Sequence, residues 1–210
     1  MGEIAQLLFS DRCVGCSRTK GLLCYTCAQE WNRSIRNVID GVPLTSSAFY
    51  SPSISRIVLR AKENNDARAR LVLAGQIALH IPQDSIIVPI PSSKSNNRRR
   101  GNDHSFLLGK EVARLTGGTV WQALLVTRRI KDQAKLSHRE RFTNLTGSYR
   151  LDPGNSFHPR VVLIDDLVTT GASMREAIRA LRSQKGIESP IIQAISACIA
   201  THHLPNTISP

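Results

Sequence analysis

The sequence has few aromatic residues, no long apolar run and no internal repeat. Phe, Trp and Tyr make up 5% of the 210 residues, which argues against a platform that binds single strands by base stacking. No apolar run approaches the roughly 18 residues of a membrane span. The start of the chain also lacks a basic segment followed by a longer apolar one, so we expect a cytoplasmic protein.

Acidic residues are also scarce beside basic ones. The chain carries 28 Lys and Arg against 16 Asp and Glu, a formal net charge of +12. Such an excess suits a polyanion, whether nucleic acid or a diphosphate-bearing metabolite, and does not distinguish the two. With 41% hydrophobic residues, the length fits one domain of about 130–150 residues and a smaller appendage.

Four of the five cysteines form two Cys-x-x-Cys pairs near the start of the chain: Cys13, Cys16, Cys24 and Cys27. Four thiolates at about 2.3 Å make a closed tetrahedral zinc site without an open position for catalysis. Disulfides do not suit a cytoplasmic chain, and an iron–sulfur cluster is a minor alternative. We therefore predict a zinc-binding N-terminal module over residues 1–44, folded by its metal. The fifth cysteine, Cys198, is expected to be a buried core thiol.

Residues 161–173 are the most informative stretch, Val-Val-Leu-Ile-Asp-Asp-Leu-Val-Thr-Thr-Gly-Ala-Ser. Four apolar residues predict a buried strand that ends at Asp165 and Asp166. A turn of small residues follows, and then a helix with one apolar face. Such a turn can bind phosphate, because backbone N–H groups converge there and the helix N-terminus adds positive potential. The alternative is an ordinary strand-to-helix turn capped by Thr and Ser.

This stretch resembles the phosphoribosyl diphosphate (PRPP) signature of the type I phosphoribosyltransferases. The resemblance implies that Asp165 and Asp166 bind the ribose hydroxyls, and that the 5-phosphate is bound by Thr169, Thr170, Gly171, Ala172 and Ser173. It also implies Mg²⁺ bound with PRPP, and an α/β fold with a mostly parallel sheet whose carboxyl ends form the site.

The other predicted elements surround this stretch. Residues 22–40 look helical, and further helices are predicted after the turn at 51–53, from Ala67 to just before Pro82, and after a cap at Asp103. Strands are predicted over residues 85–90, 119–126 and 191–200. In type I enzymes a hood covers the acceptor site, and here residues 45–80 would form it. Lys62 lies between the two hood helices, where it could face the ligand, but we expect it to be solvated instead.

The same resemblance assigns two more groups of residues. A short loop after the strand at 85–90 would bind the diphosphate through Ser92, Ser93 and Lys94, with Lys94 neutralising its charge. A flexible lid over residues 127–150 would close over PRPP, and basic residues in it would stabilise charge on the departing diphosphate. Four residues can serve, Arg129, Lys131, Arg139 and Arg141, and only Arg141 is singled out by its match to a family pattern. Lys94 and Arg141 are thus the predicted catalytic residues, and no general base stands out.

Together, the cysteine pairs, the basic run and the polar segment after it resemble the ComF family, bacterial proteins linked to natural competence. Its pattern Gln-x-x-Leu-Ser-x-x-x-Arg-x-x-Asn is matched by Gln133, Leu136, Ser137, Arg141 and Asn144. Members typically carry Arg-Gly-Phe-Asn-Gln where this chain has residues 100–104, Arg-Gly-Asn-Asp-His, so three positions differ. The resemblance implies a phosphoribosyltransferase-like domain over residues 45–210.

Two functions follow from these resemblances. The first is an enzyme that transfers phosphoribosyl from PRPP to an unidentified acceptor and releases diphosphate. The second is a DNA-handling or PRPP-sensing protein of DNA uptake, with single-stranded DNA or competence proteins as partners. In that case several arginines would touch phosphates: Arg98, Arg99, Arg100, Arg128 and Arg129.

Overall fold

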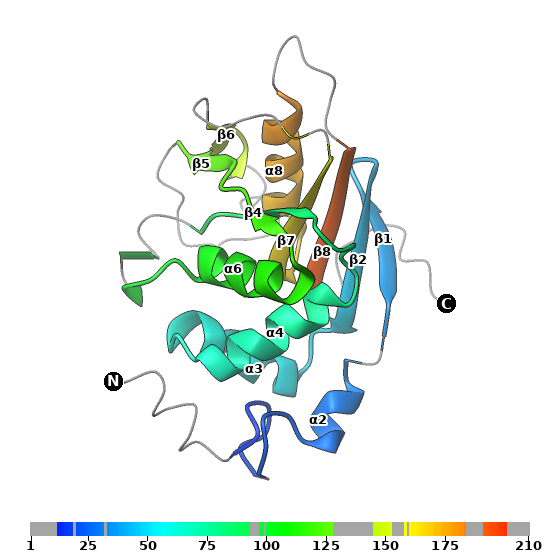
Figure 1. The fold of residues 1–210 in the computed structure, drawn as a ribbon, viewed down its shortest axis with the longest axis vertical. Coiled ribbons are helices and arrows are strands. Elements are labelled where there is room, and N and C mark those ends of the chain that lie inside the picture. Colours follow the sequence, from blue (N-terminus) through cyan, green and yellow to red (C-terminus); the bar gives the residue numbers. More distant parts are fainter. Residues whose placement is uncertain are drawn as a thin grey trace.

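The computed structural model describes residues 12–18, 20–31, 33–92, 97–98, 100–127, 145–152, 158, 160–183 and 191–200. A six-stranded sheet with the order β1-β2-β8-β7-β3-β4 forms its centre (Figure 1). The strands are β1 (Ile35–Ile39), β2 (Val42–Phe49), β3 (Ile86–Pro89), β4 (Thr119–Val120), β7 (Arg160–Val168) and β8 (Ile191–Ile199). β1 and β2 pair antiparallel, whereas the other described pairs of this sheet are parallel. The predicted α/β fold with a mostly parallel sheet is confirmed.

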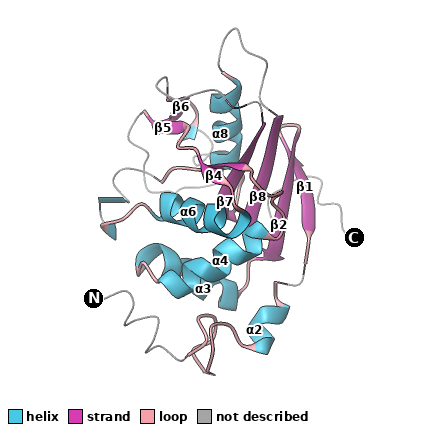
Figure 2. Cartoon of the chain, viewed as in Figure 1, coloured by secondary structure: helices cyan, strands magenta, loops and turns pink. Residues whose placement is uncertain are grey.

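Helices cover both faces of the sheet (Figure 2). One face packs against α3 (Pro52–Glu63), α4 (Ala67–Ala78) and α6 (His104–Thr116), and the other against α8 (Ala172–Arg182). Alternate residues of β7 serve the two layers: Val161 and Leu163 belong to the core with α8, and Val162 and Ile164 to the core with the other three helices. The strand is apolar on both sides because both sides are covered.

The starts of the helices follow local capping rules. Ser51 caps α3, with Pro52 in its first turn, and the Asp66 carboxylate accepts from the backbone N–H groups of Arg68 and Ala69 at the start of α4. Asp103 caps α6 by accepting from Phe106 N, as predicted. These caps fix where α3 and α6 begin, and both helices contribute side chains to the candidate site.

Three predicted elements differ in the structure. Residues 22–40 are not one helix: the short α2 (Tyr25–Gln29) is followed by β1, in which residues alternate between buried and exposed. The segment predicted as one strand over 119–126 contains β4 and then β5 (Leu124–Val126), which pairs with β6 (Tyr149–Leu151) in a separate sheet. Finally, β7 does not end at the acid pair, because β8 continues to pair with it as far as Val168 and Ile199.

The N-terminal cysteine segment packs directly on α3 and α4. Val14 and Trp31 are buried in the same core as α3 and α4. The guanidinium of Arg56 donates to the carbonyl oxygen of Gly15, and that of Arg68 donates to the carbonyl oxygens of Arg12 and Gly21, each at 3.1 Å. One arginine from α3 and one from α4 therefore bind the segment. The predicted boundary at residue 44 stays a prediction.

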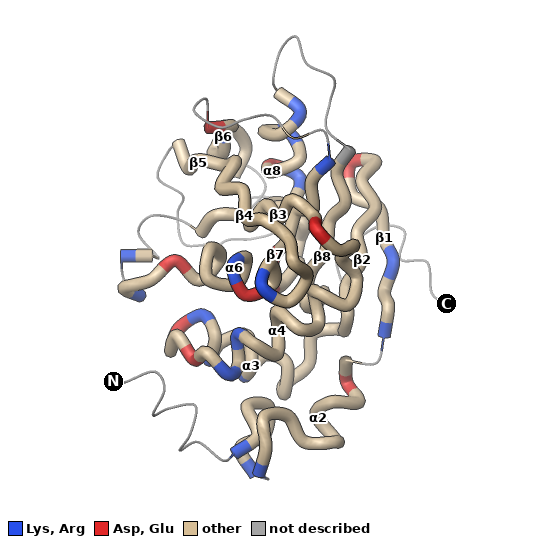
Figure 3. Tube along the Cα trace, viewed as in Figure 1, with Lys and Arg blue, Asp and Glu red and all other residues tan. Residues whose placement is uncertain are grey.

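Basic residues are spread over many elements (Figure 3). The N-terminal segment, β1, α3, α6 and α8 all carry Lys or Arg, for example Arg36, Arg60, Lys110 and Arg182. None of the helices that the structure describes is long and apolar enough to cross a membrane.

Candidate functional site at the end of strand β7

The turn between β7 and α8 has the form of an anion-binding loop. Gly171, at the N-cap of the eleven-residue α8, has φ 73°, in the left-handed region that glycine adopts without strain. Thr170 Oγ1 accepts from Ala172 N at 3.3 Å. Residues 167–174 and Asp165 line a small pocket at this turn. The helix N-terminus directs N–H groups and positive potential toward it, so the pocket suits an anion.

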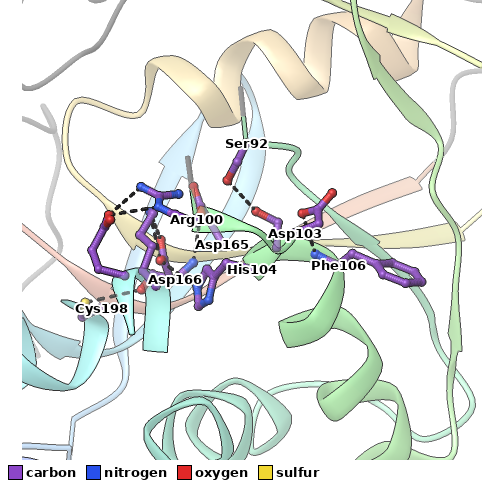
Figure 4. A network of polar contacts seen from close by, with 11 residues as sticks. Ser92, Arg100, Asp103, His104, Phe106, Asp165, Asp166 and Cys198 are labelled. Carbon is purple, nitrogen blue, oxygen red and sulfur yellow. Dashed lines mark hydrogen bonds and ion pairs between the residues drawn. The ribbon is translucent and has the colours of Figure 1, made fainter. Parts of the chain in front are cut away.

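The two acids of the motif face opposite sides of the sheet. Asp165 lines the pocket of the turn. Asp166 faces α3 and α6, where Lys62 Nζ donates to its Oδ2 at 3.0 Å and its Oδ1 at 3.2 Å, and His104 Nε2 lies 3.1 Å from Oδ2 (Figure 4). Side chains of consecutive strand residues point to opposite faces, and β7 runs through both acids. The carboxylates therefore have separate environments.

These environments move the two acidic pKa values in opposite directions. Burial, and then the charge of Asp166, raises the pKa of Asp165 well above its ordinary value. Burial alone would also raise the pKa of Asp166, but the nearby Lys62 and His104 outweigh it and hold that pKa below its ordinary range. Burial would lower the pKa of Lys62, but the charges of Asp166 and Asp165 raise it. Asp166 and Lys62 thus form an ion pair.

Further polar contacts connect the elements around the acids. Arg100, which is 6% exposed, pairs with Glu63 of α3 at 2.7 Å. The hydroxyl of Ser92, predicted to bind diphosphate, lies 3.2 Å from that of Ser105 in the first turn of α6. The buried Tyr149 donates its hydroxyl to the carbonyl oxygen of Pro91 at 3.1 Å. Burial raises the pKa of Tyr149, so this hydroxyl stays a donor. β6 is thereby tied to the loop that begins at the end of β3.

Several predicted site residues lie outside the described part of the chain. They are Ser93, Lys94, Arg141, most of the predicted lid over 127–150 with its residues Gln133, Leu136, Ser137 and Asn144, and three of the arginines, Arg99, Arg128 and Arg129. Their roles stay predictions.

Lys62 and His104 are the site residues that sequence reasoning missed. The expectation that Lys62 is solvated was wrong, because it pairs with an acid 104 residues away that is 3% exposed. His104 was noted only as one of three departures from the family pattern, yet it contacts the same carboxylate. The one signal in the sequence was the position of Lys62 near the end of a predicted helix, where it could face the ligand.

The cysteine cluster has the geometry of a metal site. The four sulfurs of Cys13, Cys16, Cys24 and Cys27 lie within 4.8 Å of one another, and those of Cys16 and Cys24 are 3.7 Å apart. A tetrahedral zinc site separates its sulfurs by about 3.8 Å. A Cβ at Gly15 would come within 2.9 Å of Cys27 Sγ, so only glycine fits there. The cluster can therefore hold a metal such as zinc.

Burial and hydrogen bonds move the pKa values of the cysteine thiols in different directions. Burial alone would raise the pKa of Cys13, but N–H donors, including Cys24 N at 3.3 Å, lower it overall. Burial raises the pKa of Cys27. Cys198 is fully buried, as predicted, and its Sγ donates to the carbonyl oxygen of Asp166 at 3.4 Å.

Known proteins that are similar to this chain match it over part of its length. A scan against protein-family models finds no match. Competence protein F of Haemophilus influenzae is 30% identical over 107 residues, which are 49% of this chain and 45% of that protein, so the match spans less than half of the relative. Orotate phosphoribosyltransferase from Aeropyrum pernix is 16% identical, with a TM-score of 0.35 over 79% of this chain and 76% of that one, a likeness too low to carry an argument. The similarity to Competence protein F over about half of the chain, the mixed α/β fold and the N-terminal cysteine cluster fit a ComF-like protein.

Proposed function

We propose that the protein binds PRPP with Mg²⁺ at the carboxyl end of β7 and transfers phosphoribosyl to an acceptor. The observation that carries this proposal is the pocket in which Asp165 and the turn at residues 169–173 lie together at the N-terminus of α8. A sugar phosphate needs both parts, because its hydroxyls donate to a carboxylate while its phosphate accepts from N–H groups. The similarity to Competence protein F and the motif at residues 161–173 support it.

Catalysis in such a site would come from positioning and electrostatics. The anomeric carbon becomes cationic as diphosphate leaves, so the residues of the site would act by holding the sugar and neutralising the leaving group. Lys94 and Arg141 are the residues proposed for the leaving group. Mg²⁺ prefers oxygen ligands, and the carboxylate of Asp165 is one; when bound, the ion would neutralise diphosphate charge. Zinc at the four cysteines would be structural, since all four positions are taken.

Calorimetric titration of PRPP with Mg²⁺ tests the proposal. We expect saturable binding by the wild type and a loss of at least tenfold in affinity for Asp165→Asn. Bound Mg²⁺ and ribose hydroxyls would favour the ionised form of Asp165, and hydrogen bonds to charged groups contribute about 1.5–3 kcal/mol. Asp40→Asn is the matched control: it makes the same change at an exposed acid in the turn between β1 and β2. The ion pair of Asp40 with Arg175 of α8 is a long one, at 3.8 Å. A folded, zinc-loaded wild type that fails to bind PRPP would overturn the proposal.

A second candidate function is DNA handling in competence. It is favoured by the relative's printed name and by the net charge of +12. Electrophoretic or fluorescence titration of single-stranded DNA at several salt concentrations would test it. A steep, linear fall of log affinity with log salt is expected if several arginines contact phosphates. Absence of binding at low salt would remove this candidate.

A further inference from the structure

The two adjacent acids of the motif lie in different environments, so they need not have the same role in ligand binding. This inference rests on the proposed PRPP site. The motif leads one to expect that both carboxylates bind the sugar. We propose instead that Lys62 and His104 are positioning residues that occupy Asp166 on the α3 and α6 side of the sheet. Asp165 is then the one carboxylate of the pair that accepts from the ribose hydroxyls.

Both oxygens of the Asp166 carboxylate already have hydrogen-bond donors within the chain. Both of its oxygens accept from Lys62, and Oδ2 also faces His104. The three side chains come from three elements, β7, α3 and the first residue of α6, and Asp166 and His104 are 3% and 1% exposed. β8 adds a fourth connection through the thiol of Cys198 to the backbone of Asp166. Asp166 is therefore the point at which the hood helix, α6 and the sheet are fastened together.

The ionised carboxylate also sets the orientation of the imidazole. Because an ionised carboxylate only accepts, His104 must donate to it through Nε2–H. His104 Nδ1 is buried and has no hydrogen-bond partner among the residues that the structure describes. The amide of a glutamine could donate to Asp166 in the same way, which makes His104→Gln a conservative change and His104→Leu a disruptive one.

Asp165 differs from its neighbour in these respects. Its Oδ1 accepts from the backbone N–H of Asp166 at 2.9 Å, and its side chain lies in the pocket of the turn. Binding a sugar at Asp166 would require the carboxylate to give up its donors Lys62 and His104, and the exchange would leave His104, which is 1% exposed, unpaired. Binding at Asp165 requires no such exchange.

A charge-pair replacement tests this division. In Lys62→Met/Asp166→Asn both charges are removed, and the amide oxygen introduced at position 166 can still accept from His104. We expect this double variant to bind PRPP within about threefold of the wild type, whereas Asp165→Asn loses at least tenfold. The single variant Asp166→Asn should bind more weakly than the double variant, because it leaves Lys62 unpaired. Equal losses in the double variant and Asp165→Asn would overturn the inference.

A second comparison leaves the charge pair in place. PRPP affinity and melting temperature are measured together for His104→Gln and His104→Leu. We expect His104→Gln to keep wild-type affinity and His104→Leu to lose affinity several-fold. Equal affinities for the two variants would contradict a positioning role that depends on the hydrogen bond. Absence of binding by the wild type itself would overturn the proposed function, so the two failures are distinguishable.

Discussion

The cysteine cluster and the acid pair both gather anionic groups, but the chain compensates them differently. Four sulfurs converge within 4.8 Å, and the donor that the structure places on Cys13 is a backbone N–H. At β7, by contrast, the chain supplies its own cation, because Lys62 reaches Asp166 from α3. The difference shows which cluster needs a bound metal ion. Four thiolates repel one another unless a metal neutralises them, whereas the charge of Asp166 is already neutralised by Lys62 before any ligand binds.

Removing metal from the cysteine cluster should have the largest effect. The free energy of structural zinc binding in isolated finger peptides is about 10–16 kcal/mol, and here the segment also packs on α3 and α4. We expect about one zinc per chain by elemental analysis, and a fall in melting temperature of more than about 10 °C on chelation or in Cys27→Ser. A metal-free chain with an unchanged melting temperature would show that the cluster needs no ion.

Lys62→Met should have the next largest effect. It leaves the carboxylate of Asp166, which is 3% exposed, without its cation, and breaking such a pair costs about 3 kcal/mol. Thermal unfolding should therefore show a melting temperature lower by roughly 6–12 °C, and Lys110→Met, which removes a lysine of α6, is the control. A melting temperature within about 2 °C of the wild type would mean that the ion pair does not stabilise the fold.

Asp166→Asn should destabilise the fold less than Lys62→Met does. It leaves Lys62 without its partner, but this side chain is 29% exposed, so solvent stabilises part of its charge, and we expect about 1–2 kcal/mol. Chemical denaturation measures this difference, and Asp40→Asn is the control. The order of the two effects would be reversed if the charge of Lys62 were the more deeply buried.

Asp165→Asn should change the pH dependence of stability in the opposite sense to Asp166→Asn. Because the folded pKa of Asp165 is raised, the folded chain binds this proton more tightly than the unfolded chain, and stability falls as pH rises from about 4 through the raised pKa. The stabilisation from Asp166, whose pKa is lowered, is present above about pH 4 and is lost at lower pH. Between about pH 4 and 8, the melting temperature of Asp165→Asn should rise relative to that of the wild type as pH rises. A constant difference would contradict the raised pKa.

Local patterns explain which parts of the fold could be predicted. The buried strand, the turn with Gly171 and the apolar face of α8 are encoded within about twenty consecutive residues, and the Asp103 cap within four. β1 was missed because Asn37 occupies a buried position, 4% exposed, that would otherwise show apolar alternation. Its Oδ1 accepts from Val38 N, a contact that only the folded backbone reveals.

The division between the two acids could not be predicted, because it depends on contacts between distant segments. Asp165 and Asp166 are the same residue type at adjacent positions, and their motif treats them alike. Which one meets Lys62 depends on where β7 ends and on how α3 and α6 pack. The sequence contains both partners of the ion pair, but 104 residues separate them.

The central claim is best tested by calorimetric titration of PRPP with Mg²⁺ into the zinc-loaded wild type, Asp165→Asn and Asp40→Asn. We predict saturable binding by the wild type and by Asp40→Asn, and at least a tenfold loss in Asp165→Asn. Equal binding by all three proteins would place the ligand away from the turn of β7, and no binding by the folded wild type would contradict a PRPP site altogether.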